Sequence, residues 1–167
     1  MKKLRKGQRG FSLLELIIVI ALTGIVTAAI TMTVFQVFNM NTRTSNRMTA
    51  VAQVQNAGKI VSEDILEAQS LAPGGCTNCV VSMNWTEVVG NQTAHQIKYT
   101  LVDKTLKRED VGLNYTTIVA EYITSASFAP VQSCSFPGCG AYNFTVTATV
   151  GKESETRVYE VKPRPGS

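Results

Sequence analysis

Four cysteines, which form two closely spaced pairs, are the residues of this 167-residue chain with the clearest capacity for chemistry. The spacings Cys76-x-x-Cys79 and Cys134-x₄-Cys139 suit the two knuckles of a four-thiolate zinc site. The same residues can instead form structural disulfides, either within each pair or crossed between the pairs. All four follow a segment expected to direct the rest of the chain out of the cytoplasm, where disulfides are stable. The sequence therefore favours disulfides over zinc and leaves their pairing open.

Residues of the kinds that catalyse reactions are few and show no catalytic arrangement. His95 is the only histidine, and the chain has no Ser-His-Asp order, no metal-spaced His/Glu set and no phosphate-binding glycine loop. The adjacent carboxylates Glu63-Asp64 and Glu109-Asp110 lie in polar stretches and are interpreted as solvated. The sequence thus predicts neither an enzyme nor a bound cofactor.

Glu15 is the only ionisable residue in the apolar run from Leu13 to Phe38. As a helix these 26 residues would span about 39 Å at about 1.5 Å per residue, whereas a bilayer core is about 30 Å thick. A charged group inside a bilayer costs about 2.5–3.5 kcal/mol or more unless it is paired, and it usually marks function. The run is therefore predicted to be a membrane-spanning helix in which the Glu15 carboxylate has a functional role.

The net charge of +4 comes from the residues that precede this run. Loss of residues 1–10 would remove five of the 16 basic residues and none of the 12 acidic ones. A basic cluster before an apolar helix keeps that end in the cytoplasm, so the charge orients the chain and does not predict nucleic-acid binding. An ordinary secretory signal peptide has a shorter apolar region. A plain signal anchor would explain the run but not Glu15.

The segment around the start of the apolar run resembles the prepilin peptidase motif of the type IV pilin and type II secretion pseudopilin superfamily. That motif is a short basic leader ending in Gly, then Phe-Ser/Thr-Leu-x-Glu at the start of an apolar helix. The resemblance implies cleavage between Gly10 and Phe11, N-methylation of Phe11, and pairing of Glu15 with the new α-amino group of a neighbouring subunit, which sets axial register. The residues that carry it are Lys6-Gly7-Gln8-Arg9-Gly10-Phe11-Ser12-Leu13-Leu14-Glu15.

The helix is predicted to continue beyond the apolar run. No proline occurs between Phe11 and Ala72, and an apolar stripe recurs at spacings of three and four until Pro73-Gly74-Gly75. The second half of this helix is expected to pack under a globular head. The stripe contains Val51, Val54, Gly58, Val61, Ile65, Ala68 and Ala72.

After residue 75, alternating β-branched and aromatic residues indicate strands. They are expected at 80–85, 96–101 and 142–150, with further candidates at 106–108, 117–123 and 156–161, and with a tight turn at 102–105. We therefore predict an α+β fold, a long N-terminal helix packed against one small antiparallel sheet of about five or six strands. The expected divisions are a leader at 1–10, a transmembrane or filament-core helix at 11–38, its amphipathic continuation at 39–72, a β-rich head at 73–162 and a loose tail at 163–167.

Two further segments are similar to the J-type minor pseudopilins and W-type minor pilins. This finer resemblance implies a minor subunit at the filament tip that starts or regulates assembly. There are two alternatives: a major pilin, or a tip module that binds DNA, a surface or a secreted substrate. The basic residues of the head are scattered along the sequence, which does not favour binding of nucleic acid. The similar residues are Gln53, Asn56, Ala57, Asp64, Ile65 and Ala68 on the helix, and Tyr99, Leu101, Leu106 and Arg108 in the head.

The resemblance also implies partners and a location. The partners are the prepilin peptidase/methyltransferase, other pilin or pseudopilin subunits, an inner-membrane assembly platform and membrane lipid. The chain is expected to cross the cytoplasmic membrane once, with its N-terminus in the cytoplasm and its head outside, and then to enter an extracytoplasmic filament.

Overall fold

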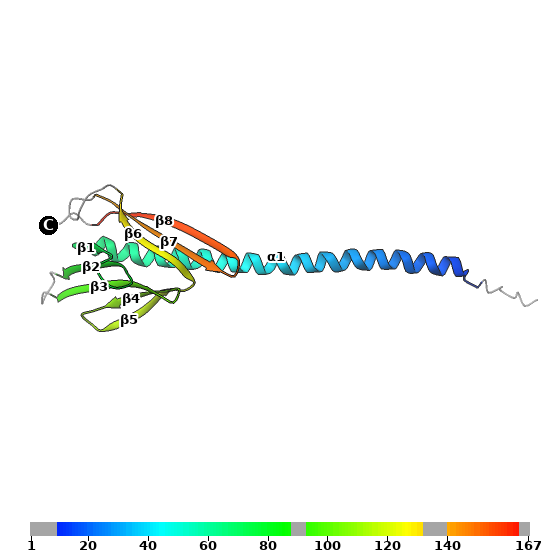
Figure 1. Ribbon diagram of the computed structural model, residues 1–167, viewed down its shortest axis with the longest axis horizontal. Coiled ribbons are helices and arrows are strands. Elements are labelled where there is room, and N and C mark those ends of the chain that lie inside the picture. The colour runs from blue at the N-terminus through cyan, green and yellow to red at the C-terminus, as the bar shows by residue number, and fades with distance from the viewer. Residues whose placement is uncertain (1–9, 88–92, 132–139, 164–167) are drawn as a thin grey trace, which may run out of the picture. The chain divides into compact units, whose positions relative to one another are not determined.

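The computed structural model describes residues 10–87, 93–131 and 140–163. Within these ranges it has one helix and eight strands (Figure 1). The chain divides into two compact units, Met1–Thr42 and Arg43–Ser167. The elements in chain order are α1 (Leu13–Glu67), β1 (Ser70–Pro73), β2 (Cys79–Glu87), β3 (Thr93–Val102), β4 (Thr105–Asp110), β5 (Tyr115–Ala120), β6 (Ile123–Pro130), β7 (Tyr142–Val150) and β8 (Glu153–Val161).

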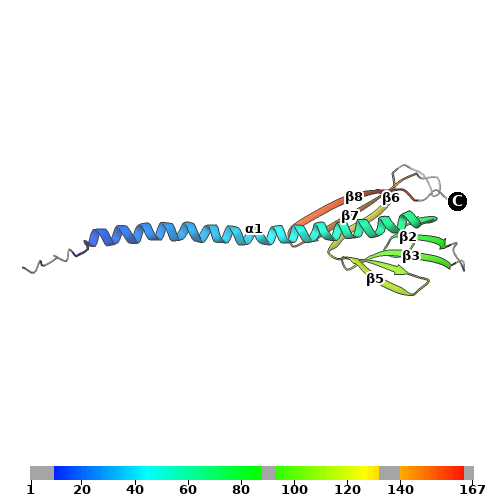
Figure 2. The same cartoon turned by 180° about the vertical axis from the view of Figure 1, so that it is seen from behind.

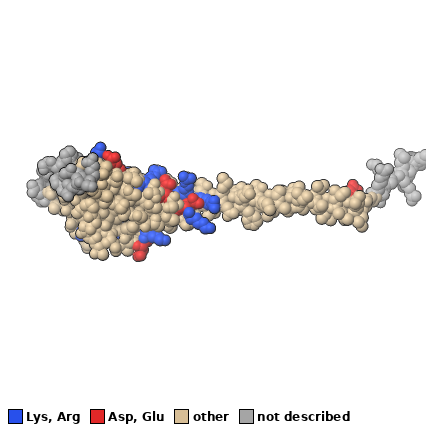
Figure 3. All heavy atoms as spheres, turned by 45° about the horizontal axis from the view of Figure 1, so that its top comes forward, with Lys and Arg blue, Asp and Glu red and all other residues tan. Residues whose placement is uncertain are grey.

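In the first unit, α1 begins directly after Ser12, whose carbonyl oxygen accepts the backbone N–H groups of Glu15 at 3.0 Å and Leu16 at 3.2 Å. Threonine hydroxyls such as that of Thr27 donate to the carbonyl four residues earlier, which satisfies them within an apolar helix. The helix is unbroken at Gly24. It is long and apolar enough to cross a membrane, and among the described residues none of its most apolar window is buried. Figure 3 shows this stretch almost without charged groups.

In the second unit, the later turns of α1 bury one face against two antiparallel sheets. Sheet A has the strand order β1-β2-β3-β4-β5, and sheet B has the order β6-β7-β8. Figures 1 and 2 show sheet A on one side of the helix and sheet B on the other. The apolar core combines side chains of the helix and of both sheets, because each element has one apolar face to bury. The buried helix residues are Ala50, Val54, Ala57, Gly58, Val61 and Ile65.

The α+β class is confirmed, but the prediction of a single sheet of five or six strands is wrong. The residues 117–123, predicted as one strand, comprise the end of β5, a bend at 121–122 and the start of β6, and these two strands lie in different sheets. Tyr122 has a φ of 60°, a left-handed conformation that no continuous strand can contain. The chain therefore leaves sheet A after β5 and begins sheet B with β6.

The prediction that the helix continues to residue 72 is also wrong, because α1 ends at Glu67. The next residues form β1, in which Ser70 pairs with Asn84 and Pro73 with Val81 of β2. These cross-strand hydrogen bonds replace the helical ones. Consequently Ala72 is exposed, while Leu71 is buried in the core.

The other predicted strands are confirmed, several of them with longer bounds. The predicted strand 142–150 coincides with β7, and 80–85, 96–101 and 156–161 lie within β2, β3 and β8. The turn between β3 and β4 has positive φ at both central residues, 49° at Asp103 and 61° at Lys104. This is the combination of a type I′ turn, which suits the twist of a two-stranded hairpin.

Candidate functional site

The bond between Gly10 and Phe11 precedes the first helical turn and is exposed. A β-carbon at residue 10 would have none of the described residues beyond its chain neighbours within 4 Å, and Phe11 is among the exposed apolar residues. A peptidase must hold its substrate as extended backbone, and this dipeptide lies outside the hydrogen-bonded helix that begins at Leu13. The geometry of these residues therefore permits cleavage at this bond.

Glu15 lies in the first turn of α1 with an exposed side chain. The helix N-terminus favours a carboxylate, because the free N–H groups there carry partial positive charge. The chain has no lysine, arginine or histidine between residues 10 and 42. Any cation that pairs with Glu15 inside a membrane must therefore come from the chain's own N-terminus or from another molecule.

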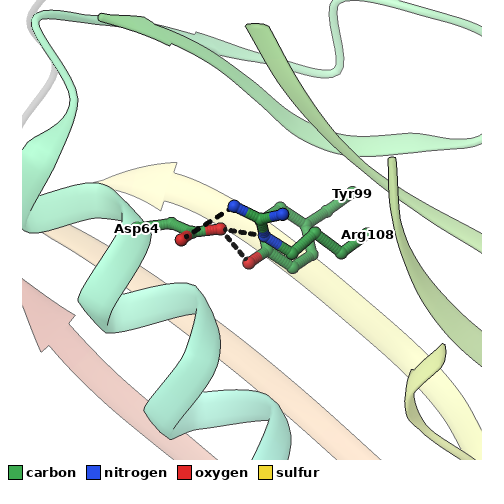
Figure 4. Close-up of polar contacts among 3 residues, drawn as sticks. All are labelled: Asp64, Tyr99 and Arg108. Atoms are coloured by element: carbon green, nitrogen blue, oxygen red, sulfur yellow. Dashed lines mark hydrogen bonds and ion pairs between the residues drawn. The ribbon is translucent and has the colours of Figure 1, made fainter. Parts of the chain in front are cut away.

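Asp64, Tyr99 and Arg108 meet where α1 crosses sheet A (Figure 4). The Asp64 carboxylate accepts hydrogen bonds from the Tyr99 hydroxyl at 2.5 Å, from Arg108 Nε at 2.7 Å and from Arg108 Nη2 at 3.3 Å. Tyr99 is fully buried, while the side chains of Asp64 and Arg108 are 14% and 24% exposed. The three residues are a largely buried, charge-assisted link between the helix and the β3–β4 hairpin.

The protonation states of this cluster follow from its surroundings. Burial, reinforced by the nearby Asp64 charge, raises the pKa of Tyr99 far above its ordinary value of 10.0. The hydrogen bond to Asp64 raises the pKa of Arg108 further. Near neutral pH, Tyr99 is thus a neutral donor and Arg108 a cation.

Two amides and one tyrosine make further links between α1 and the sheets. The Asn56 side chain donates to the Val119 carbonyl oxygen at 2.7 Å, and Gln53 Oε1 accepts the Glu121 N–H at 2.7 Å. From sheet B, the Tyr159 hydroxyl donates to the Val54 carbonyl oxygen at 3.1 Å. Its ring covers Gly58 so closely that a β-carbon there would lie inside it.

The interpretation of both carboxylate pairs as solvated is wrong for one member of each. Asp64 lies in the cluster above, and Asp110 is buried, with Oδ1 accepting the Leu113 N–H at 3.1 Å. Gln53, Asn56, Asp64, Tyr99 and Arg108 all belong to the pattern that resembles the minor subunits, but that pattern did not indicate which of them meet. No sequence signal pointed to Tyr159, which lies in a strand of otherwise mostly polar residues.

Cys76 and Cys79 form a disulfide in the turn between β1 and β2, which is the local pairing. Cys134 and Cys139 lie outside the described residues, so their predicted pairing stays a prediction. Among the residues that the structure describes, no three His, Cys, Asp or Glu side chains gather as metal ligands. His95 stacks on Trp85 with ring centroids 5.4 Å apart.

Comparison with known proteins gives one match. The family model of the prokaryotic N-terminal methylation motif matches residues 5–31. No curated protein and no solved structure matches the chain. The match covers the Gly10–Phe11 bond, Glu15 and the first turns of α1, and it supports a pilin-like structural subunit that is processed by prepilin peptidase and assembles with other pilin subunits. This chain carries the prepilin-type N-terminal methylation motif of type IV pilins and pseudopilins.

Proposed function

We propose that this chain is a minor subunit of a type IV pilus or a type II secretion pseudopilus, processed between Gly10 and Phe11 and methylated on Phe11. The observation that carries the proposal is the methylation motif at residues 5–31, at the start of an unburied apolar helix that continues into a folded unit. In this role the chain is structural and has no catalysis of its own.

The basic residues before Gly10 orient the chain with its N-terminus in the cytoplasm and its head outside. Cleavage then creates an α-amino cation at Phe11. Pairing of this cation with Glu15 of a neighbouring subunit neutralises two membrane charges that are each costly when alone. The absence of any other cation between residues 10 and 42 supports this role for Glu15. Membrane lipid and an inner-membrane assembly platform complete the set of partners.

The experiment compares membranes from cells that do and do not produce prepilin peptidase. With the peptidase, the N-terminal peptide should begin at methylated Phe11; an intact Met1 terminus in those cells would refute the proposal. The Glu15→Ala chain should be cleaved normally but enter filaments at least about tenfold less, because an unpaired charge remains. Leu16→Ala is the matched control. Equal incorporation of both variants would exclude a role for Glu15 in register.

We infer a tip-type, minor position from the residues shared with the J-type and W-type subunits. Three of these residues, Asp64, Tyr99 and Arg108, form one cluster, which supports their being a functional set rather than a chance pattern. Copy number distinguishes the alternatives. A tip subunit should occur at a few copies per purified filament, whereas a major pilin would be its most abundant protein.

A further inference from the structure

Asparagine followed two residues later by threonine recurs in the part of the chain after residue 75. Four of the five asparagines in this part start an Asn-x-Thr sequence without proline at its middle position, whereas none of the four earlier asparagines does. Serine and threonine make up 19 of these 92 residues, so about one match would be expected by chance. Asn-x-Ser/Thr is the acceptor sequence for N-linked glycans on exported proteins. The four sequences start at Asn84, Asn91, Asn114 and Asn143.

Two of these sequences lie inside paired strands, and strand geometry alone explains them. Asn84 lies in β2 between β1 and β3, and Asn143 lies in β7 between β6 and β8. Residues two positions apart in a strand share one face, so an asparagine and a threonine on the face opposite the core give this spacing. Phe144, the middle residue of the second sequence, is fully buried. A transferase could bind that segment only if the sheet opened. Asn91 lies outside the described residues.

The sequence Asn114-Tyr115-Thr116 is different, because it begins in the turn that joins β4 to β5 (Figure 1). All three residues are exposed. Tyr115 and Thr116 pair with β4, and none of the described strands pairs with the other side of β5. An enzyme can therefore approach this sequence from one backbone side without displacing a buried residue.

The turn holds its backbone in a defined conformation. The buried Asp110 carboxylate accepts the Leu113 N–H at 3.1 Å, and Asn114 has a φ of 49°. Asparagine tolerates this left-handed conformation better than most residues do. The turn thus explains an asparagine at 114 on local grounds, but it does not explain the threonine two residues later.

Large apolar side chains lie on both sides of Asn114. Leu113 is 71% exposed and Tyr115 is 61% exposed. Exposed apolar patches commonly mark contact with another molecule. A sugar ring has apolar C–H faces as well as hydroxyl groups, so a glycan on Asn114 could pack on these two neighbouring side chains.

We propose that Asn114 is an acceptor for an N-linked glycan, which is transferred outside the cytoplasm from a lipid-linked oligosaccharide diphosphate. In this step Asn114 Nδ2 forms a bond to the anomeric carbon of the first sugar, the bond from that carbon to the diphosphate oxygen breaks, and one amide proton leaves. The lipid diphosphate is released, and nothing is oxidised or reduced. Thr116 is the residue that the transferase recognises beside the acceptor. The proposal rests on the proposed function, because it requires the head to be outside the cytoplasm.

The test is mass spectrometry of the full chain, purified from the cells that produce it naturally together with its filament subunits. A protease that cuts after glutamate releases residues 110–121, between the cuts at Glu109 and Glu121. We expect this peptide to carry a glycan, which electron-transfer fragmentation locates on Asn114. Thr116→Val should lower the modified fraction at least about tenfold, whereas Thr116→Ser, which keeps the hydroxyl group, should retain it within about threefold.

Asn143→Asp is the matched control, because it removes the amide of a sequence whose middle residue is buried. It should change the modified fraction at Asn114 less than about twofold. Asn114→Asp removes the acceptor amide but keeps a side chain that tolerates the left-handed turn, so this variant should fold and should carry no glycan on residues 110–121.

The proposal is overturned if residues 110–121 are unmodified in the wild-type chain, if the glycan lies on a hydroxyl group instead, or if Thr116→Val and Thr116→Ser have equal modified fractions. The same digest contains the N-terminal peptide. A chain that begins at methylated Phe11 but lacks the glycan refutes only this proposal, whereas an intact Met1 terminus refutes the proposed function.

Discussion

Removal of the Asp64 carboxylate should destabilise the folded unit that begins at Arg43 more than any nearby surface change. In Asp64→Ala the fully buried Tyr99 hydroxyl and the Arg108 guanidinium lose their shared acceptor. A buried donor without a partner costs about 1–3 kcal/mol, and breaking a buried ion pair costs about 3–5 kcal/mol. Because the Arg108 side chain is 24% exposed, water can replace part of the lost interaction. We expect a loss of about 3 kcal/mol.

The assay is thermal unfolding of the processed chain in detergent, followed by near-ultraviolet circular dichroism. That signal reports Trp85, the only tryptophan, and the tyrosines, all of which lie after residue 43. A loss of about 3 kcal/mol should lower Tm by about 12 °C for a domain of this size. Glu63→Ala is the control; it removes an exposed partner of Lys59, 4.0 Å away, and should change the stability by less than about 0.5 kcal/mol.

A combined apolar replacement separates the cost of an orphaned charge from the net contribution of the cluster. The variant Asp64→Leu with Tyr99→Phe and Arg108→Met leaves no donor without an acceptor, so it should unfold within about 1 kcal/mol of the wild type. If Asp64→Ala lost less than about 1 kcal/mol, or if the triple variant were as unstable as the single one, the reasoning would be refuted.

Two other substitutions test the packing of the same unit. Gly58→Ala should lower the free energy of unfolding by about 1–3 kcal/mol, because the added methyl group displaces the Tyr159 ring. Gly24→Ala is the control and should leave the unit's Tm unchanged, because the space around Gly24 is free. Equal Tm values for the two variants would contradict this prediction. Tyr142→Phe should be neutral or stabilise by up to about 1 kcal/mol, since its buried hydroxyl has no hydrogen-bond partner among the described residues and its ring would still stack on Phe128. A clear loss of stability in urea unfolding would show that this hydroxyl is satisfied.

Local patterns were sufficient to predict the long helix, most of the strands and the motif around Gly10, Phe11 and Glu15. The alternation of residue types predicted both ends of β7 correctly, because its side chains are alternately buried and half-buried over most of the strand. Two of the failures concern contacts between distant segments. Nothing near Asp64 in the sequence shows that it meets Tyr99 and Arg108, 35 and 44 positions away.

The change from helix to strand after Glu67 has the same origin. Residues 68–72 continue the apolar spacing of a helix, but their backbone pairs with β2, and this pairing depends on how the sheet assembles. The second sheet was missed because the reversal at Tyr122 has a backbone conformation that Gly or Asn signals in sequences and tyrosine does not.

The links between α1 and the two sheets also determine how the head would bear a pulling force. Tyr159 of sheet B holds the helix at Val54, and Tyr99 and Arg108 of sheet A hold it at Asp64, ten residues or about 15 Å further along. Tension applied along the helix axis would load both attachments in shear at the same time. The helix can then slide out of the head only if the hydrogen bonds to both sheets break together. We therefore expect the helix to separate from the head in one step at a threshold force, and not gradually.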